Sequence, residues 1–177
     1  DNECGPIVLR QGPAGMVTTD ATVRSTWRTP TVTSRVDGDV VAVRVDCPAL
    51  GFVTSVKLVV LVPPDGSIEA RSSAGSVTAE GLSSALDLRS SAGSITGTRL
   101  TSTTVVADTS AGAVALSWSD DADPTTIQAS SSAGSVRVTI PDVPAVTYDV
   151  DADSSAGSVT VNVRTDPASS RTLRATS

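Results

Sequence analysis

The sequence is 177 residues long, contains no His, and has a formal net charge of −6 from 13 basic and 19 acidic residues. Because His is the commonest general base and the usual transition-metal ligand, its absence excludes a Ser-His-Asp triad and argues against metal or cofactor chemistry. An acidic chain with one Lys is also a poor nucleic-acid binder, because phosphate neutralisation supplies most of that affinity.

The chain has only four aromatic side chains, and its apolar residues are mostly Val, Ala, Leu and Ile. Such residues suit pleated sheets, so we expect an all-β fold with a thin core. The longest apolar run, Leu58–Val62, is too short to cross a bilayer. No signal peptide is visible and the sequence begins at Asp1, so we interpret it as a mature or trimmed ectodomain whose targeting or anchoring segment lies outside it.

Cys4 and Cys47 are the only cysteines. A bond between them would contribute about 4 kcal/mol on the loop-entropy model, whereas the alternative is a pair of buried free thiols. We expect the disulfide, because the rest of the composition points to an extracytoplasmic protein.

Residues 1–62 are predicted to form an N-terminal β cap or the first coils of the fold. Two strands, Thr31–Val36 and Asp39–Asp46, flank Asp37-Gly38, which is a two-residue hairpin signal. Val41, Val43 and Val45 would then form one inward row.

A further strand, Ser55–Val62, ends at the turn signal Pro63–Gly66. We expect Trp27 and Phe52 in the core of the cap, which would cover the open end of the repeats that follow.

The rest of the chain, 63–177, is built on an internal repeat. Ser-Ala-Gly recurs five times, with successive glycines 18, 19, 22 and 23 residues apart, and Ser or Thr precedes every triplet. Val or Ile follows two residues after each Gly, and both flanks alternate apolar and polar residues as strands do. The triplets are Ser73-Ala74-Gly75, Ser91-Ala92-Gly93, Ser110-Ala111-Gly112, Ser132-Ala133-Gly134 and Ser155-Ala156-Gly157.

Each repeat is therefore predicted to contain a strand, a Ser-Ala-Gly corner, a second strand and a return loop. Because such a unit cannot bury its one apolar face alone, we expect the coils to stack about 4.8 Å apart. Gly would allow close backbone approach, Ala would fill the narrow edge of the interior, and the Ser hydroxyls would bond local backbone or the next coil. The predicted fold is a two-sheet β-solenoid, β-helix- or β-roll-like, with 18–23-residue coils and one domain continuous with the cap.

The return loops vary in length and chemistry, in contrast to the fixed corners. We expect the loop edge to be free of packing constraint and to be the interaction side of the repeat. The loops are Gly81–Ser84, Arg99–Ser102, Ser119–Pro124, Pro141–Ala145 and Thr165–Ser170.

The last six residues, Thr172–Ser177, repeat the pattern of Thr126–Ser131, with Leu173 and Ala175 in the inward places. We expect them to form the outermost strand, half of an incomplete coil, paired with the strand around Thr147–Asp153. Its other edge would then be open to strand addition or to edge-to-edge self-association.

The run Val56–Gly66, which leads into a series of Ser-Ala-Gly-Ser-Val turns, resembles the bacterial adhesin-like β-strand-repeat domain, also called the toastrack domain. The resemblance extends over roughly residues 15–177. It implies an exported or membrane-anchored bacterial protein of unknown function, of a kind found near envelope-stress systems. The family brings no catalytic residues, and its general pattern includes neither the Cys pair nor the segment before Gly15.

Side chains that could carry chemistry also have simpler structural explanations. A catalytic Ser would have only Lys57 as a base, and Lys57 occupies an outward strand position. Asp120, Asp121 and Asp123 could bind Ca²⁺, but they lack the spacing of known calcium loops, so a solvated loop is the favoured interpretation.

Three further acidic residues alternate along one predicted strand. A Trp in a different strand occupies a position that points inward. Asp149, Asp151 and Asp153 lie on one face, which is either a solvated face or an acidic strip for a basic partner. Trp118 has the parity of Val114, so we expect it in the core.

We therefore expect no enzyme activity, no cofactor and no metal site. The leading expectation is an extracytoplasmic binding or adhesin-like module, secreted or membrane-anchored, that contacts an unknown protein or cell-surface ligand at the return loops. Two alternatives remain open: a sensory or regulatory ectodomain of an envelope-stress membrane protein, and a self-assembling structural element. Membrane contact would come only through a segment outside this sequence.

Overall fold

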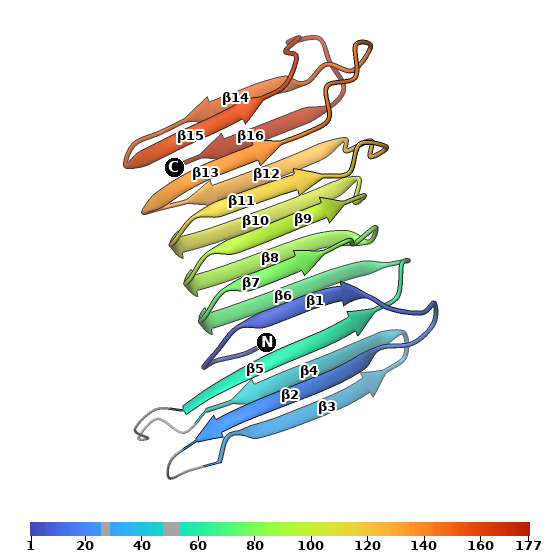
Figure 1. Cartoon of the computed structure of the whole chain (residues 1–177), viewed down its shortest axis with the longest axis vertical. Helices are drawn as coiled ribbons and strands as arrows, with labels where there is room; N and C mark the ends of the chain where they lie inside the picture. Colours follow the sequence, from blue (N-terminus) through green and yellow to red (C-terminus); the bar gives the residue numbers. More distant parts are fainter. Residues whose placement is uncertain (26–28, 48–53) are drawn as a thin grey trace.

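The chain folds as a stack of β coils in a computed structural model that describes residues 1–25, 29–47 and 54–177 (Figure 1). Two sheets run the length of the stack, one of eight strands and one of six, and a two-stranded hairpin lies at the N-terminal end. The predicted two-sheet β-solenoid is confirmed. Within the described ranges, no helix is long and apolar enough to span a membrane. Trp27 and Phe52, expected in the cap core, lie outside the described residues.

The eight-stranded sheet contains the strand that follows each Ser-Ala-Gly corner. Its strands from β15 to β5 are all parallel, because every coil winds in the same sense, and only β2 at the end runs antiparallel. In order across the sheet, the strands are β15 (Gly157–Asn162), β13 (Gly134–Thr139), β11 (Val114–Trp118), β9 (Ile95–Leu100), β7 (Val77–Glu80), β1 (Ile7–Gln11), β5 (Thr54–Val62) and β2 (Thr18–Ser25).

The six-stranded sheet contains the strand that precedes each corner, and it is parallel throughout. In order, its strands are β14 (Asp149–Asp153), β16 (Thr172–Thr176), β12 (Thr126–Ser131), β10 (Thr104–Ala111), β8 (Ala85–Ala92) and β6 (Ser67–Ala74).

The alternating apolar residues of both sheets meet between them and form a single core. Equivalent residues of successive coils stack in register, so that Leu86 pairs with Val105 and Val105 with Ile127. Trp118 lies in the core, 7% exposed, and its Nε1 donates to the Ser102 carbonyl at 2.9 Å. The packed rows therefore come mainly from Val, Leu, Ile and Ala, the apolar residues that dominate the composition.

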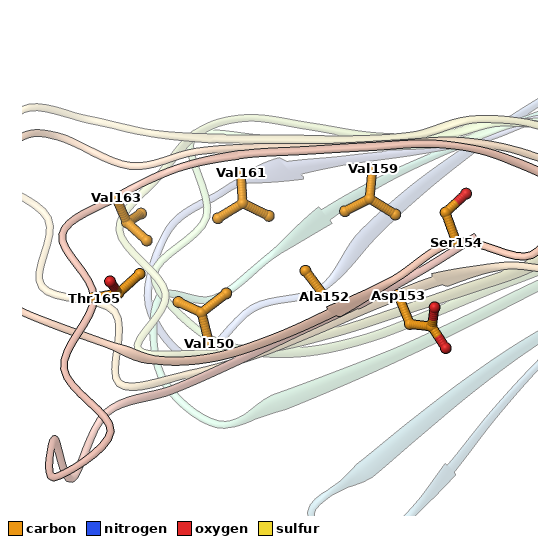
Figure 2. Close-up of a pocket in the computed structure, with 8 residues that line it drawn as sticks. All are labelled: Val150, Ala152, Asp153, Ser154, Val159, Val161, Val163 and Thr165. Carbon is orange, nitrogen blue, oxygen red and sulfur yellow. The ribbon is translucent and has the colours of Figure 1, made fainter.

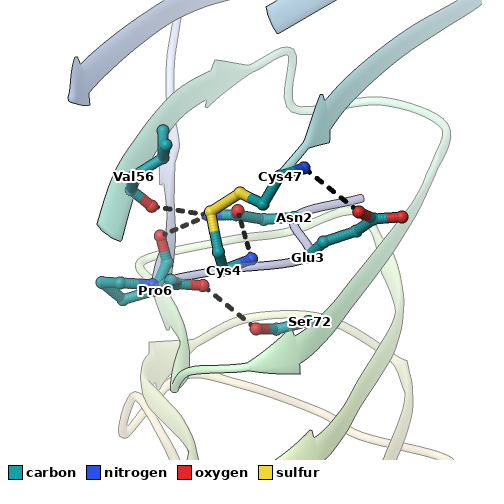
Figure 3. Close-up of a disulfide and its surroundings, with 8 residues drawn as sticks. Asn2, Glu3, Cys4, Pro6, Cys47, Val56 and Ser72 are labelled. Carbon is teal, nitrogen blue, oxygen red and sulfur yellow. Dashed lines mark hydrogen bonds between the residues drawn. A yellow bond between two sulfur atoms is a disulfide. The ribbon is translucent and has the colours of Figure 1, made fainter. Parts of the chain in front are cut away.

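The N-terminal residues 2–11 form an additional coil that lacks the triplet. Strand β1 lies between β5 and β7, with Ile7 opposite Val77. Asn2 bridges the backbones of Ser72 and Val45 and so connects the six-stranded sheet to the hairpin. It is 1% exposed, and its Nδ2 donates to the Val56 carbonyl at 2.7 Å (Figure 3). The cap therefore belongs to the stack.

The predicted hairpin is present as β3 (Thr31–Asp37) and β4 (Val40–Asp46), but two details of the prediction are wrong. The turn consists of Gly38 and Asp39, one residue later than expected, with Gly38 at φ +58°, which suits the first position of a II′ turn. The inward row is incomplete: Val45 is fully buried, Val43 is half-buried and Val41 is 41% exposed. Within the described ranges, Val45 belongs to the core and Val43 packs against it, whereas Val41 does not reach it.

The C-terminal strand β16 pairs with β14, as predicted, but it is not the outermost strand. Its other edge pairs with β12, where Leu173 lies opposite Ile127 and Ala175 opposite Ala129. Leu173 and Ala175 are both 0% exposed. The expected open edge on this strand is therefore wrong, because the chain returns into the stack and leaves β14 at the end.

Candidate functional site

The Ser-Ala-Gly edge carries a continuous ladder of hydroxyl-to-carbonyl hydrogen bonds. Four of the five Ser or Thr residues that precede a triplet donate to the carbonyl of the corner Gly in the coil before it, and Ser177 makes the fifth bond in place of the exposed Ser154. The pairs are Ser72 to Gly5 (3.0 Å), Ser90 to Gly75 (2.9 Å), Thr109 to Gly93 (2.8 Å), Ser131 to Gly112 (2.8 Å) and Ser177 to Gly134 (2.6 Å). The ladder satisfies both the buried hydroxyls and the corner carbonyls.

The corner glycines stack directly on one another. A Cβ on Gly93 or Gly112 would come within 3.0 Å of the backbone of the preceding corner glycine, closer than real Cβ atoms approach. The predicted close approach is confirmed, but the predicted role of Ala is wrong. Ala92 and Ala111 are exposed, and the residue that fills the narrow interior is the Ser or Thr before each of the first four triplets.

The ladder is a structural arrangement, because its hydroxyls are already used as hydrogen-bond donors to the backbone. The buried hydroxyls at Ser72, Ser90 and Ser131 donate to backbone carbonyls, and no His exists to accept a proton from them. Lys57 is exposed on β5, as expected for its outward position.

The predicted disulfide joins Cys4 to Cys47 with a Cα–Cα distance of 6.1 Å (Figure 3). It ties the segment before β1 to the end of β4, 43 residues along the chain. Asn2 Oδ1 accepts from the Cys4 amide at 3.2 Å, and a Glu3 carboxylate oxygen accepts from the Cys47 amide at 3.2 Å. The disulfide thus fastens the N-terminal coil, which has no Ser-Ala-Gly corner of its own.

The return-loop edge is packed at its base, so the expectation that it is free of packing constraint is wrong in part. Leu82, Leu100 and Ser102 are all 0% exposed, and the Ser102 hydroxyl donates to the Leu82 carbonyl at 3.0 Å. Ser84 donates in the same way to the Pro63 carbonyl at 3.0 Å. Only the outer parts of these loops vary freely.

Three return loops gather near the C-terminal end into what we call the C-terminal loop cluster, residues 119–125, 140–148 and 163–171. Tyr148 lies at its centre, 2% exposed, and its hydroxyl donates to the Pro124 carbonyl at 2.9 Å. Its backbone amide donates to the Arg164 carbonyl, and its carbonyl accepts from the Asp166 amide, both at 2.9 Å. Burial raises the pKa of the Tyr148 phenol, so the hydroxyl stays protonated and donates.

Two ion pairs across loops hold the cluster together. Arg171 contacts both carboxylate oxygens of Asp123, at 2.5 and 3.0 Å, and also donates to the Pro124 carbonyl at 3.0 Å. Arg164 contacts both oxygens of Asp142, at 2.7 and 3.3 Å, and lowers the pKa of that carboxyl. The segment Ser119–Pro124 is therefore partly structural.

The remaining charge of the cluster is negative. It contains five Asp against two Arg, and both Arg are used in the pairs just described. Asp120 and Asp121 are exposed at the tip of the first loop. Within the described ranges, no group of three or more His, Cys, Asp or Glu could hold a metal ion. Asp149, Asp151 and Asp153 form an exposed row on β14, as predicted.

Gly5, Asn2 and Tyr148 are structural positions that the sequence analysis missed. Gly5-Pro6-Ile7-Val8-Leu9 does match the corner pattern, with apolar residues two and four positions after the Gly. That spacing alone could have identified the additional coil. Asn2 and Tyr148 have no periodic signal, because their partners come from distant segments.

Known proteins resemble this chain at two levels. No curated protein matches its sequence. A solved structure of a "putative cell adhesion protein" from Clostridium sporogenes is similar, with a TM-score of 0.49 and 10% identity, over 99% of this chain and 88% of that one. The family model described as Toastrack DUF4097 matches residues 32–176, which is most of the chain.

Proposed function

We propose that this chain, which belongs to the Toastrack DUF4097 family, is a non-enzymatic, extracytoplasmic binding module that contacts a basic partner through its C-terminal loop cluster. The partner is a protein or a cell-surface ligand that presents Lys, Arg or other cationic groups. The Ser-Ala-Gly edge and the two sheets act as the rigid support for these loops.

The proposal of a non-enzymatic role rests on the commitments of the polar side chains. The sequence has no His, and the ladder hydroxyls at the fixed edge are used in hydrogen bonds to backbone carbonyls. A nucleophile needs an adjacent base and an accessible position, and these buried hydroxyls have neither. An extracytoplasmic location is supported by the disulfide, because such bonds persist mainly in oxidising compartments.

The observation that carries the binding proposal is the contrast between the two edges. The Ser-Ala-Gly edge repeats the same hydroxyl-to-carbonyl hydrogen bond from coil to coil, whereas the C-terminal loop cluster contains the longest loops and a net negative surface. These loops are held in place by Tyr148, Asp123–Arg171 and Asp142–Arg164. Loops that are ordered in advance lose less entropy when they bind, and acidic groups on them steer a cationic partner.

The test uses a fluorescein-labelled decalysine peptide and measures fluorescence anisotropy at low ionic strength. The double variant Asp120→Asn/Asp121→Asn removes two exposed loop charges, and Asp151→Asn/Asp153→Asn removes two from the outer face of β14 as the matched control. We expect the loop variant to weaken binding by about threefold or more, since exposed charge pairs are worth up to about 1 kcal/mol, and the control to change it little. Absence of binding to the wild-type chain, or equal losses in both variants, would contradict the proposal.

A further inference from the structure

The solenoid core is uncovered at its C-terminal end. In the preceding coil Val136 and Val138 are 1% and 0% exposed, whereas the equivalent Val159 and Val161 of β15 are only half-buried. Together with Val150 and Ala152 of β14, the β15 valines line an open groove of about 410 Å³. Figure 2 shows the two apolar rows pointing toward one another across this groove.

The two sheets are staggered, so that each strand of one packs against two strands of the other. Strand β13 contacts both β12 and β16, and β15 contacts both β16 and β14. Strand β14 is thus the last member of this alternation and extends beyond β15. The next vacant position lies on the eight-stranded sheet, beside β15 and across from β14.

We propose that β14 of a second copy of this chain fills the vacant position, so that two copies join end to end at their C-terminal ends. A two-fold axis parallel to the strands exchanges the two sheets and reverses the stack. Strand β14 of each copy then lies antiparallel beside β15 of the other, and the alternation between the sheets continues across the junction. The contact is isologous and closes as a dimer.

Strands β14 and β15 are the terminal strands of their sheets, so each has one edge that pairs with no other strand of the described residues. At the start of the β14 edge the backbone of Tyr148 is already bonded to Arg164 and Asp166, so the junction would use the residues that follow it. The Asp149 amide donates to the Arg171 carbonyl, and the Asp153 carbonyl accepts from the Ser177 amide. Because the backbone groups of a strand alternate in direction, Val150 and Ala152 direct theirs toward the open edge of β14. Strand addition at such an edge is a recurrent mode of recognition.

The charges of the two strands are compatible with the junction. The outward face of β14 carries Asp149, Asp151 and Asp153. The outward face of β15 carries Ser158 and Thr160, and Arg137 lies opposite Thr160 on β13. The acidic strand would therefore lie beside hydroxyl donors and near a cation, with no carboxylate on β15 opposing it.

The size of the junction sets its strength. The groups of Val150 and Ala152 that face the open edge would make about four backbone hydrogen bonds in each strand pair and about eight in the whole junction, which is within the range of a specific interface. Roughly ten residues on each side is nevertheless fewer than the 20–30 of a standard interface. We therefore expect a weak dimer, with a dissociation constant on the order of 10⁻⁴ M.

Sedimentation equilibrium of the purified chain between about 10 µM and 1 mM tests the junction. We expect a monomer of 17.8 kDa that converts to a dimer as the concentration rises, and no larger species. Ala152→Lys should remain a monomer, because Ala152 is exposed in one copy but faces the interior of the dimer. Thr160→Lys adds the same charge on the outward face, beside the acidic strand of the second copy, and should dimerise at least as well.

Far-UV circular dichroism and thermal melts verify that both variants fold. Should Ala152→Lys fail to fold, concentration-dependent amide shifts of the wild-type chain at Ala152, Val159 and Val161 replace it as the readout. A wild-type chain that stays monomeric at 1 mM overturns the proposal. A dimer that Ala152→Lys does not affect, or amide shifts confined to other regions, would also overturn it. Open-ended polymers would overturn it as well, because they would indicate head-to-tail contact.

Discussion

Replacing Gly112 by alanine perturbs the stacked corner in two ways, and two other glycines of the chain each show one of these effects alone. Gly112 has φ +145°, a region that side chains rarely adopt, and its added Cβ would meet the Gly93 backbone inside 3.0 Å. Gly75 has the same close approach, to Gly5, without a positive φ. Gly81 has φ +63° but nothing within 4 Å of the added Cβ.

Comparing these three glycines gives the expected loss of unfolding free energy for the left-handed conformation, for the close backbone approach and for both together. Gly81→Ala should lose about 1 kcal/mol, which is the ordinary cost of a left-handed residue. Gly75→Ala should lose about 1–3 kcal/mol, because the coils must separate locally to admit the Cβ. Gly112→Ala combines overpacking with a conformation that is essentially restricted to glycine, so it should lose about 2–5 kcal/mol.

Equilibrium urea unfolding of the three variants measures these differences, and thermal melts provide a second readout at about 2–4 °C per kcal/mol for a chain of this length. The m-value must stay constant, because a repeat protein can lose its cooperativity. If Gly75→Ala and Gly112→Ala cost no more than Gly81→Ala, the stacked-corner account is refuted.

Three other predictions concern the hydroxyl ladder, the disulfide and the loop ion pairs. Ser131→Ala removes a buried donor to the Gly112 carbonyl and should cost about 1–2 kcal/mol, whereas the exposed neighbour Ser132→Ala should be nearly silent; equal urea midpoints would contradict the ladder. Mass spectrometry of non-reduced peptides should recover Cys4 linked to Cys47, and reduction should lower stability by about 4 kcal/mol; two alkylatable thiols in folded protein would show that the bond is absent. Carboxyl NMR should give Asp142 a pKa below the ordinary value because of Arg164, and Arg164→Gln should return it to that value. The stability contributed by this pair is present above the unfolded-state pKa, about 3.9, and is lost as the pH falls through the lowered folded value; an unshifted titration in the wild type would rule the pair out.

The corners and coil strands were predictable because each repeat states the same pattern again. Five triplets in register, with Val or Ile two residues after each Gly, leave one consistent stacking for the coils from β6 to β13. The alternation also placed Leu173 and Ala175 inward correctly. The alternation of apolar and polar residues predicts which face of a strand is buried, and the repeat predicts which coil strands lie side by side.

What could not be predicted depends on where a strand is inserted and on what lies opposite it. The pattern of Thr172–Ser177 is the same whether β16 lies outside β14 or between β14 and β12, so the sequence does not distinguish the two arrangements. Val41 has the parity of Val45, but within the described ranges only Val45 of the two belongs to the core. The Asp123–Arg171 pair joins residues 48 apart, and no local signal connects them.

The central claim is that both ends of the chain are inserted into one continuous solenoid, and hydrogen exchange of β16 tests it most directly. The measurement should be made at low protein concentration, at which the chain is expected to be monomeric. The account predicts that the amides of Leu173 and Ala175 exchange more slowly than those of Val150 and Ala152, because β16 is paired on both edges and β14 on only one. Faster exchange at Leu173 and Ala175 than at Val150 and Ala152 would contradict the insertion of β16.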